Sequence, residues 1–279
     1  MRRIACLSAL LRVMLLMTAL TAWPARAEIV WHWEDRFSAA EQHSLQTWIT
    51  RTLLAVEDLV APLPFDVHVH FYRLADRGEP VPWANTRRGR TQGVNFHVDP
   101  AFPADAFYAD WTAAHELSHL LIPSLSEASS WFAEGFASYM QYQVMQHMAV
   151  LDADEISAAY RKRIERAENL FRHPGMPFVI AARALRLAGD YPTYYWGGAT
   201  YFLRADMALR RRASGSLSAL LSDYIACCRD SEPDIAQLVQ QFDRLLGKEF
   251  FTDLLLEFQT RPGFPRYRDA LRALAADSR

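Results

Sequence analysis

Apolar residues recur along most of this chain at the three- and four-residue spacing of amphipathic helices. The pattern predicts a first helix over residues 38–60. Over residues 65–72 apolar and polar side chains alternate, which is typical of a strand with one buried face. A second strand is predicted over residues 92–98, whereas residues 74–91, with their Gly, Pro, Asn and Arg, indicate a loop. The first hundred residues therefore predict a small sheet with one helix beside it.

The rest of the chain keeps helical spacing almost throughout. One helix is predicted to begin at Asp105 or Asp110 and to end before Pro123, and a second to begin at Ser129 or Ser130. Two later apolar stripes are predicted to form core helices: Ile235, Leu238, Val239, Phe242 and Leu246 before Gly247, and Phe250, Phe251, Leu254, Leu255 and Phe258 before Pro262. A sheet followed by helices predicts an α+β fold.

The first of the two middle helices contains a single H-E-x-x-H sequence, from His115 to His119. Residues four apart share one helix face, so His115 and His119 can present two imidazole nitrogens to one metal ion. Glu116 lies about 100° further round the helix and can reach a water molecule at that ion instead of ligating it. Two imidazoles beside a carboxylate favour zinc-dependent hydrolysis, with the histidines as ligands and Glu116 as general base.

Zinc hydrolases use three protein ligands, so one more donor is expected. Glu134 stands among apolar residues, where a carboxylate is costly unless it is paired or bound to metal. Glu127 is the competing candidate, but it lies in a Ser-rich link that indicates a solvated loop. His68 and His70 could also bind metal, although the wet face of an edge or outer strand is their simpler interpretation. The sequence favours Glu134, with one zinc ion per chain, and the adjacent Gly135 would let two helices approach closely.

The sequence WFAEGFASY, at residues 131–139, resembles the gluzincin (peptidase MA-like) metallopeptidases, whose alanyl and glycyl aminopeptidases carry W-x-N-E-G-F-A-S-Y after H-E-x-x-H. Fourteen residues separate His119 from Glu134, a gap nearer to that of the small peptidase-MA-like domains, and Ala replaces the family's Asn. The resemblance implies a thermolysin-like α+β core. It also implies zinc at His115, His119 and Glu134, with Glu116 as general base.

Residues 194–199 resemble the Y-x-K-G-A stretch of the same peptidases, with Gly197 in place of Lys. This likeness implies that Tyr195 hydrogen-bonds the tetrahedral intermediate, a contact that stabilises charge appearing only in the transition state. Packing is the alternative role for this tyrosine. Together the resembling segments cover roughly residues 92–226.

Residues 92–96 occupy the place of the gluzincin strand that borders the cleft and pairs with an extended substrate. They lack the acid of the family's G-x-M-E-N motif, which receives the free amine of an aminopeptidase substrate. An ammonium group without an acidic partner would carry a burial penalty. We therefore expect internal peptide bonds to be cut at least as well as terminal ones, with endopeptidase or aminopeptidase specificity unresolved.

Residues 1–27 have the pattern of a secretory signal peptide: two early arginines, an apolar core and an A-x-A site ending at Ala27. A retained membrane anchor is the alternative, but Arg12 interrupts the apolar run and leaves too few residues to span a bilayer. The sequence therefore predicts an exported, periplasmic or secreted protein with no stable membrane span.

Removal of residues 1–27 takes away four arginines and no acids, which changes the formal charge from −2 to −6 and leaves 279 − 27 = 252 residues. This mild acidity does not favour nucleic acid or an anionic membrane as a partner. The basic runs at residues 87–90, 161–163 and 210–212 are interpreted as solvated. Only Cys227 and Cys228 follow the leader; neighbouring cysteines rarely bridge, so no disulfide framework is expected.

These observations predict an exported zinc peptidase that acts on a peptide or protein substrate. Its expected parts are residues 28–100, an α/β subdomain with the cleft-edge strand, and residues 101–279, the zinc-binding helices and a helical lobe. The alternative is a non-catalytic envelope protein that retains a zinc or peptide-binding site. An intact Glu116 argues against that alternative, because a structural zinc site needs no general base. Oligomeric state is not encoded in these patterns.

Overall fold

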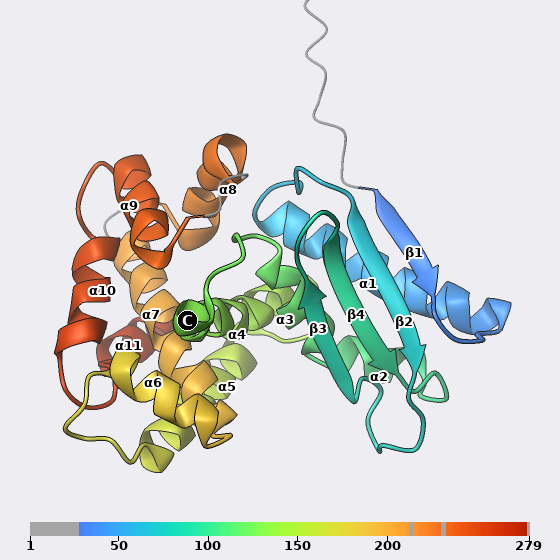
Figure 1. Cartoon of the computed structure of the whole chain (residues 1–279), viewed down its shortest axis with the longest axis horizontal. Coiled ribbons are helices and arrows are strands. Elements are labelled where there is room, and N and C mark those ends of the chain that lie inside the picture. The colour runs from blue at the N-terminus through green and yellow to red at the C-terminus, as the bar shows by residue number, and fades with distance from the viewer. Residues whose placement is uncertain (1–27, 212–214, 230–232, 278–279) are drawn as a thin grey trace, which may run out of the picture.

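The computed structural model describes residues 28–211, 215–229 and 233–277. The predicted signal peptide, at residues 1–27, lies outside this part of the chain. A four-stranded sheet backed by helix α1 forms one side of the molecule, and a lobe built almost entirely of helices forms the other (Figure 1). The predicted α+β class is confirmed.

The sheet has the strand order β1-β2-β4-β3, with bounds Ile29–Trp33 for β1, Val67–Arg73 for β2, Trp83–Arg87 for β3 and Gln92–Val98 for β4. The strands β1, β2 and β4 run parallel, and β3 pairs antiparallel with β4. Both predicted strands are confirmed as β2 and β4. The predicted loop over residues 74–91 was wrong where β3 forms, because this short strand pairs along one side only and its side chains show no apolar alternation.

The interior position of β2 and β4 corrects two further expectations. Val67, Val69 and Phe71 are fully buried on one face of β2, with His68 and His70 on the other, so the predicted faces are right. However, β2 lies between two strands and is not an edge strand. The strand β4, predicted to border the cleft, is also interior; the edge strand on the side of the helical lobe is β3 (Figure 1).

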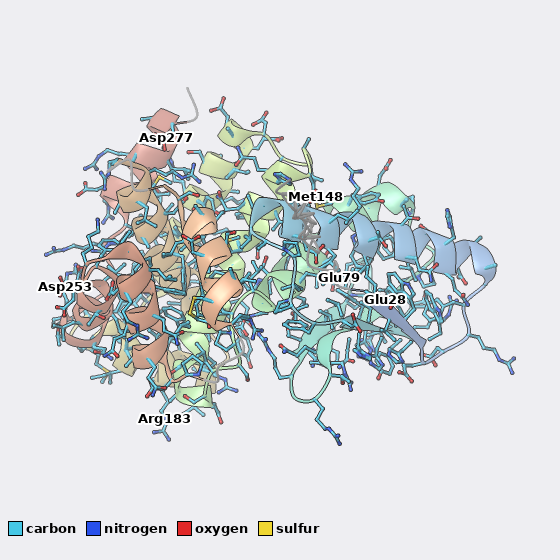
Figure 2. The ribbon with its side chains drawn as sticks, turned by 90° about the horizontal axis from the view of Figure 1, so that it is seen from above. Glu28, Glu79, Met148, Arg183, Asp253 and Asp277 are labelled. Carbon is cyan, nitrogen blue, oxygen red and sulfur yellow. A yellow bond between two sulfur atoms is a disulfide. The ribbon has the colours of Figure 1, made fainter. Side chains whose placement is uncertain are left out.

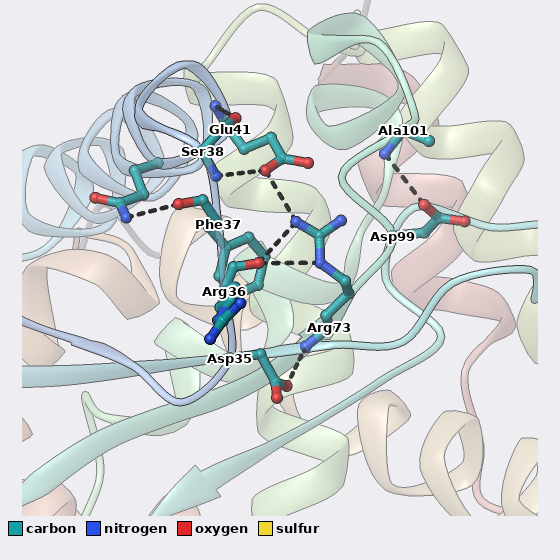
Figure 3. A network of polar contacts seen from close by, with 9 residues as sticks. Asp35, Arg36, Phe37, Ser38, Glu41, Arg73, Asp99 and Ala101 are labelled. Atoms are coloured by element: carbon teal, nitrogen blue, oxygen red, sulfur yellow. Dashed lines mark hydrogen bonds and ion pairs between the residues drawn. The ribbon is translucent and has the colours of Figure 1, made fainter.

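Helix α1, Ala39–Leu59, confirms the helix predicted over residues 38–60. Ser38 and Glu41 form a capping box at its start, where each side chain bonds the other residue's backbone N–H. The Glu41 carboxylate also accepts a hydrogen bond at 2.9 Å from Arg73, at the end of β2, which ties sheet and helix together (Figure 3). Trp48 of α1 packs on Phe96 of β4 with ring centroids 5.3 Å apart, so α1 covers the apolar face of the sheet.

The helical part of the described chain follows the sheet. Its elements are α2 (Ala104–Ala109), α3 (Thr112–His119), the 3-10 turn η1 (Glu127–Ser129), α4 (Ser130–His147), α5 (Ala153–Leu170), α6 (Phe178–Leu187), α7 (Tyr191–Arg211), α8 (Leu217–Cys228), α9 (Ile235–Leu246), α10 (Phe251–Thr260) and α11 (Arg268–Asp277). The two predicted C-terminal stripes are confirmed as α9 and α10. Among these described helices none is both long and apolar enough to cross a bilayer.

Helices α4 and α7 cross with their backbones in contact. A Cβ atom added to Gly135 of α4 would lie 2.3 Å from the carbonyl carbon of Gly198 in α7, a distance that real side chains cannot adopt. The close approach predicted for Gly135 is therefore confirmed, and α7 is its partner. Met148, at the far end of α4, lies beside α1 (Figure 2), and its carbonyl accepts a hydrogen bond at 3.1 Å from Arg51 of α1. Helix α4 thus joins the two sides of the molecule.

Two of the basic runs interpreted as solvated contribute a buried or paired arginine. Arg210 binds the buried Asp206, which also accepts a hydrogen bond from Tyr139 at 2.5 Å. Arg88 is half-buried and donates to the end of α3. Sequence reasoning missed the contacts of Arg88 because its acceptor belongs to another element, and it missed those of Arg210 although Asp206 lies four residues earlier on the same helix, α7. Residues 161–163 are exposed as predicted, and Arg212 lies outside the described residues.

Cys227 and Cys228 are joined by a disulfide, contrary to the expectation from their adjacency. They are the last two residues of α8, where the final carbonyl groups have no partner within the helix. The bridge therefore closes the end of a helix without interrupting one.

Candidate metal centre

The H-E-x-x-H sequence lies on α3, which is shorter than predicted. The main chain leaves helical geometry at Asp110, so the expected single helix is divided into α2 and α3. The Asp110 carboxylate accepts a hydrogen bond from the Thr112 N–H at 2.8 Å and so marks the start of α3. Helix α3 ends at His119, which places His115 and His119 on one face of its last two turns.

The crossing helix α4 brings Glu134 to both histidines. The Glu134 Oε2 atom lies 3.2 Å from His115 Nε2 and 3.6 Å from His119 Nε2. Within the described residues these three side chains form the one group of three or more His, Cys, Asp or Glu whose ligand atoms all lie within 4.8 Å of one another. Two imidazole nitrogens and a carboxylate oxygen are a donor set that catalytic zinc sites use. The residues present therefore fit a zinc ion.

The electrostatics of the centre favour a bound cation. Burial by itself raises the pKa of Glu134, but the charges and hydrogen bonds of His119 and His115 outweigh it and hold that pKa well below its usual range. Burial lowers the pKa of His115, yet the hydrogen bond and charge of Glu134 leave it raised overall. The carboxylate is thus ionised among buried groups, which is where an unpaired negative charge would be most costly.

Gln141, two turns after Glu134 along α4, orients His115. The His115 Nδ1 atom lies 3.0 Å from Gln141 Oε1, and because an amide oxygen only accepts, Nδ1 carries the proton. With Nδ1 held by Gln141, Nε2 is the nitrogen on the side of Glu134 and is the one that could bind a metal ion in place of its proton. Sequence reasoning missed Gln141, although its spacing of seven residues from Glu134 puts both on one face of a helix.

Glu116 is held by the edge strand of the sheet. The Thr86 hydroxyl of β3 donates to Glu116 Oε2 at 2.7 Å, and it lies 3.3 Å from the Glu116 carbonyl oxygen. The charge of Glu116 also contributes to the raised pKa of the Tyr195 hydroxyl. Thr86 was missed because β3 was predicted to be loop.

Tyr195 and Tyr194 point in different directions from the start of α7. The Tyr195 ring centroid lies 6.0 Å from that of His115, and burial and then the charges of Glu134 and Glu116 raise the pKa of its hydroxyl. Tyr194 is buried and its hydroxyl lies 2.6 Å from Ser130 Oγ. Tyr195 therefore has its ring beside His115 and a hydroxyl that is neutral at physiological pH, whereas the Tyr194 hydroxyl is bound to Ser130.

Two arginines bind the carbonyl end of α3. Arg88 donates to the His119 carbonyl at 2.6 Å, and Arg229 donates to the Leu120 carbonyl at 2.9 and 3.1 Å. Both also donate to the Gln92 side chain. Burial and the charge of Arg229 lower the pKa of Arg88 to about 10, so it remains a cation at neutral pH. Positive charge at this end of the helix complements its dipole and fixes the position of His119.

The alternative ligands lie away from the centre. Glu127 is 82% exposed and forms an ion pair with Arg186, as expected for a solvated link. His68 and His70 lie on the sheet, where His68 contacts His32 and His70 contacts Glu34. None of them belongs to the group formed by the three residues of the centre.

No protein-family model and no curated protein matches the sequence. Solved structures do match. They include a two-domain M1 zinc metallopeptidase mutant bound to L-arginine (TM-score 0.57, 17% identity, 87% of this chain and 50% of that chain) and an M1 zinc metallopeptidase mutant from Deinococcus radiodurans bound to a Tyr-Ser-Ala substrate (0.53, 20%, 84% and 47%). An aminopeptidase N family protein from Idiomarina loihiensis is also similar (0.58, 13%, 88% and 46%).

The fold of the described chain is therefore that of the matched region of M1 zinc metallopeptidases, a gluzincin family. The chain spans about half the length of these structures. At these identities the likeness establishes the fold, and the resemblance stated from the sequence motifs is confirmed at that level.

Proposed function

We propose that this protein is a zinc-dependent peptidase of the gluzincin type, with one zinc ion per chain and a thermolysin-like arrangement of the centre. The observation that carries this proposal is that His115, His119 and Glu134 converge while a separate carboxylate lies beside them. That carboxylate is Glu116, which follows His115 directly on α3. A structural site needs no such carboxylate. The alternative, a non-catalytic envelope protein with a retained zinc or peptide-binding site, leaves Glu116 and its Thr86 contact without a role.

In this proposal each residue of the chain has a distinct task. A zinc ion held by the three ligands would polarise the scissile carbonyl and acidify the attacking water. Glu116, oriented through one oxygen by Thr86, uses the other to take the proton from that water and later returns it to the leaving amine. Tyr195, a neutral phenol beside His115, donates a hydrogen bond to the developing oxyanion.

The proposed function is tested by Glu116→Gln in the mature protein. The change keeps shape but removes the base, so we expect zinc content to remain near one per chain while hydrolysis of a peptide library falls by at least about a hundredfold. Metal analysis and mass-spectrometric detection of cleaved bonds give the two readouts. Wild-type protein that binds zinc and cuts no peptide would support the non-catalytic alternative.

We further propose that the edge strand β3, Trp83–Arg87, takes the substrate-pairing role that the sequence assigned to residues 92–96. Among the described strands it has one unpaired edge and lies beside Glu116, whereas β4 is paired on both sides. It carries no acid to hold a free amine. N-acetylated and free forms of one peptide, compared by kcat/KM, test this: equal rates or a preference for the blocked form support internal cleavage, and strong selectivity for the free amine supports an aminopeptidase.

Export with removal of residues 1–27 is part of the same proposal, supported by the A-x-A pattern. N-terminal analysis of the exported protein should find Glu28 first. A chain that retains Met1 in the membrane would contradict it.

A further inference from the structure

A partly open cavity of about 200 Å³ adjoins the metal centre. Its walls come from the start of α3, from α4, from α5 and from the start of α7. Most of the wall area is apolar and aromatic, and the residues that matter here are Trp111, Gln141, Arg163, Tyr191, Tyr195 and Trp196. No residue of this cavity was assigned to it from the sequence.

Three of the wall residues contact His115 directly. The Trp111 ring meets the His115 ring edge to face at 5.4 Å between centroids, and the Tyr195 ring lies 6.0 Å away. Gln141 holds His115 through the hydrogen bond described above. A group inside the cavity would therefore lie against the ring of a proposed zinc ligand and beside the proposed oxyanion donor. The cavity therefore meets the centre through the His115 ring and through Tyr195, since His119, Glu134 and Glu116 are not among its wall residues.

The dimensions and lining of the cavity select for one large side chain. Its volume leaves room for a single ring system, and aromatic walls interact with a ring through offset and edge-to-face contacts. Small side chains would leave much of this space unfilled and lose those contacts. None of the described residues that line the cavity is a carboxylate, so its walls would not favour a basic side chain.

Arg163 adds a charge to one wall. It is exposed on α5, and within the described chain it forms no ion pair. A guanidinium offers paired donors that match a carboxylate. The neighbouring Lys162 has the same charge and exposure but does not line the cavity, which makes it a matched control.

Resting on the proposed peptidase function, we infer that this cavity is a substrate subsite that binds an aromatic side chain next to the scissile bond, with Arg163 binding a carboxylate that the substrate carries beside it. That carboxylate has two sources in peptides: the C-terminus of the chain or a neighbouring acidic residue. The substrate class is therefore peptides with an aromatic residue followed or preceded by negative charge.

The test uses quenched fluorescent peptides of one sequence with Phe, Ala or Lys at each position flanking the cut. We expect Phe to exceed Ala in kcat/KM by at least about tenfold at one of the two positions, as filling an apolar pocket does, with Lys the poorest. Equal rates for the three side chains at both positions would overturn the subsite.

The role of the Arg163 charge is tested with the Phe peptide that has the highest kcat/KM. One pair compares a C-terminal acid with its amide, and another compares Asp with Asn beside the Phe. Loss of the relevant carboxylate should lower kcat/KM about three- to tenfold in wild type, and Arg163→Glu should abolish or reverse that preference while Lys162→Glu keeps it. The peptide pair whose kcat/KM changes identifies whether the carboxylate is the C-terminus or a neighbouring acidic residue. Equal behaviour of the two variants would remove Arg163 from the subsite.

The aromatic wall is tested with Tyr191→Ala, which removes a half-exposed wall residue. Leu187→Ala, an exposed apolar residue of α6 outside the cavity, is its control. We expect the first to reduce the Phe-over-Ala preference about threefold or more and the second to leave it unchanged.

Calorimetric binding of the same peptides to zinc-loaded Glu116→Gln protein separates this inference from the proposed function. Binding that prefers Phe with a carboxylate supports the subsite even if wild type hydrolyses nothing, in which case only the proposed activity fails. Hydrolysis or binding without that preference overturns the subsite and leaves the activity intact.

Discussion

The molecule contains two groups of histidines, and they differ in how their nitrogens are arranged. The candidate metal centre joins His115, His119 and Glu134 across two crossing helices, so that the three possible ligand atoms lie within 4.8 Å of one another. The sheet histidine cluster, His32, His68 and His70, lies on the outward face of β1 and β2. Both groups gather three ionisable side chains in close contact.

In the sheet histidine cluster the imidazole nitrogens contact neighbouring side chains and do not converge on one point. His32 Nε2 lies 2.9 Å from His68 Nδ1, and His70 Nδ1 lies 2.6 Å from the Glu34 carboxylate. The rings of His32 and His70 stack with centroids 4.0 Å apart. Side chains on one face of a sheet stand roughly parallel, so they stack, whereas side chains from crossing helices converge. Contact between histidines is therefore not evidence of a metal site without convergence of their nitrogens.

Removal of a ligand should have the largest effect and separates the two groups. We expect Glu134→Ala and His115→Ala to weaken zinc binding by at least about a hundredfold, because a three-ligand site loses a donor and keeps buried, unpaired partners. His68→Ala and His70→Ala should leave zinc binding unchanged. Zinc titration with a competing chelator measures all four. Full zinc affinity in Glu134→Ala would exclude Glu134, and a loss in the His68 or His70 variant would make the sheet cluster a metal site.

The next largest effect is expected for Tyr195→Phe. Loss of one oxyanion donor typically lowers kcat by about ten- to a thousandfold, while zinc content should stay the same because Tyr195 is not a ligand. Tyr194→Phe is the matched control, since its hydroxyl binds Ser130 instead of facing the centre. Steady-state kinetics on one peptide decide between them. An unchanged kcat for Tyr195→Phe would make this tyrosine a packing residue only.

Gln141→Leu should have an intermediate effect on zinc. Loss of a partner that orients a ligating histidine lowers metal affinity by about ten- to a hundredfold, so the three ligands alone should bind more weakly. Gln143→Leu, on the same helix, removes an amide that donates to Tyr160 and not to the centre. Zinc affinity of the two variants, compared with their melting temperatures, distinguishes a loss of orientation from a general loss of stability. Equal affinities would mean that His115 is oriented without Gln141.

The smallest effect is expected in the sheet histidine cluster. Burial, and then the charges of His70 and His68, lower the pKa of His32 below its usual 6.5. The unfolded chain therefore takes up the proton first as pH falls, so the contribution of neutral His32 to stability is full above pH 6.5 and is lost toward its folded pKa. We expect His32→Gln to reduce the fall in Tm between pH 7.5 and 5.5 by on the order of 1 °C. The exposed His147→Gln is the control, and no difference between them would show that His32 titrates freely.

The local sequence pattern by itself determined several helices and strands and the candidate zinc residues of this protein. The spacing of His115 and His119, and the position of Glu134 in an apolar helix, point to a zinc centre before any contact is known, because helix geometry alone puts residues four apart on one face. The strands β2 and β4 and the helices α9 and α10 follow from periodicity in the same way. Gly135 predicts a close helix crossing, since only glycine lacks the Cβ that would prevent it.

Other features were decided by the tertiary structure. The edge strand β3 forms through its backbone pairing with β4, so its side chains carry little signal, and Thr86 reaches Glu116 only because of that pairing. The local sequence predicts that Arg88 is a solvated cation, but in the folded chain it donates to a carbonyl at the end of α3.

The side of α7 that faces the centre also depends on how that helix packs, which directs Tyr195 to His115 and Tyr194 to Ser130. The cavity beside His115 is built from four helices far apart in the sequence. Periodicity assigns a residue to a face of its own element, whereas contacts between elements depend on which faces meet, and a single sequence does not encode that locally.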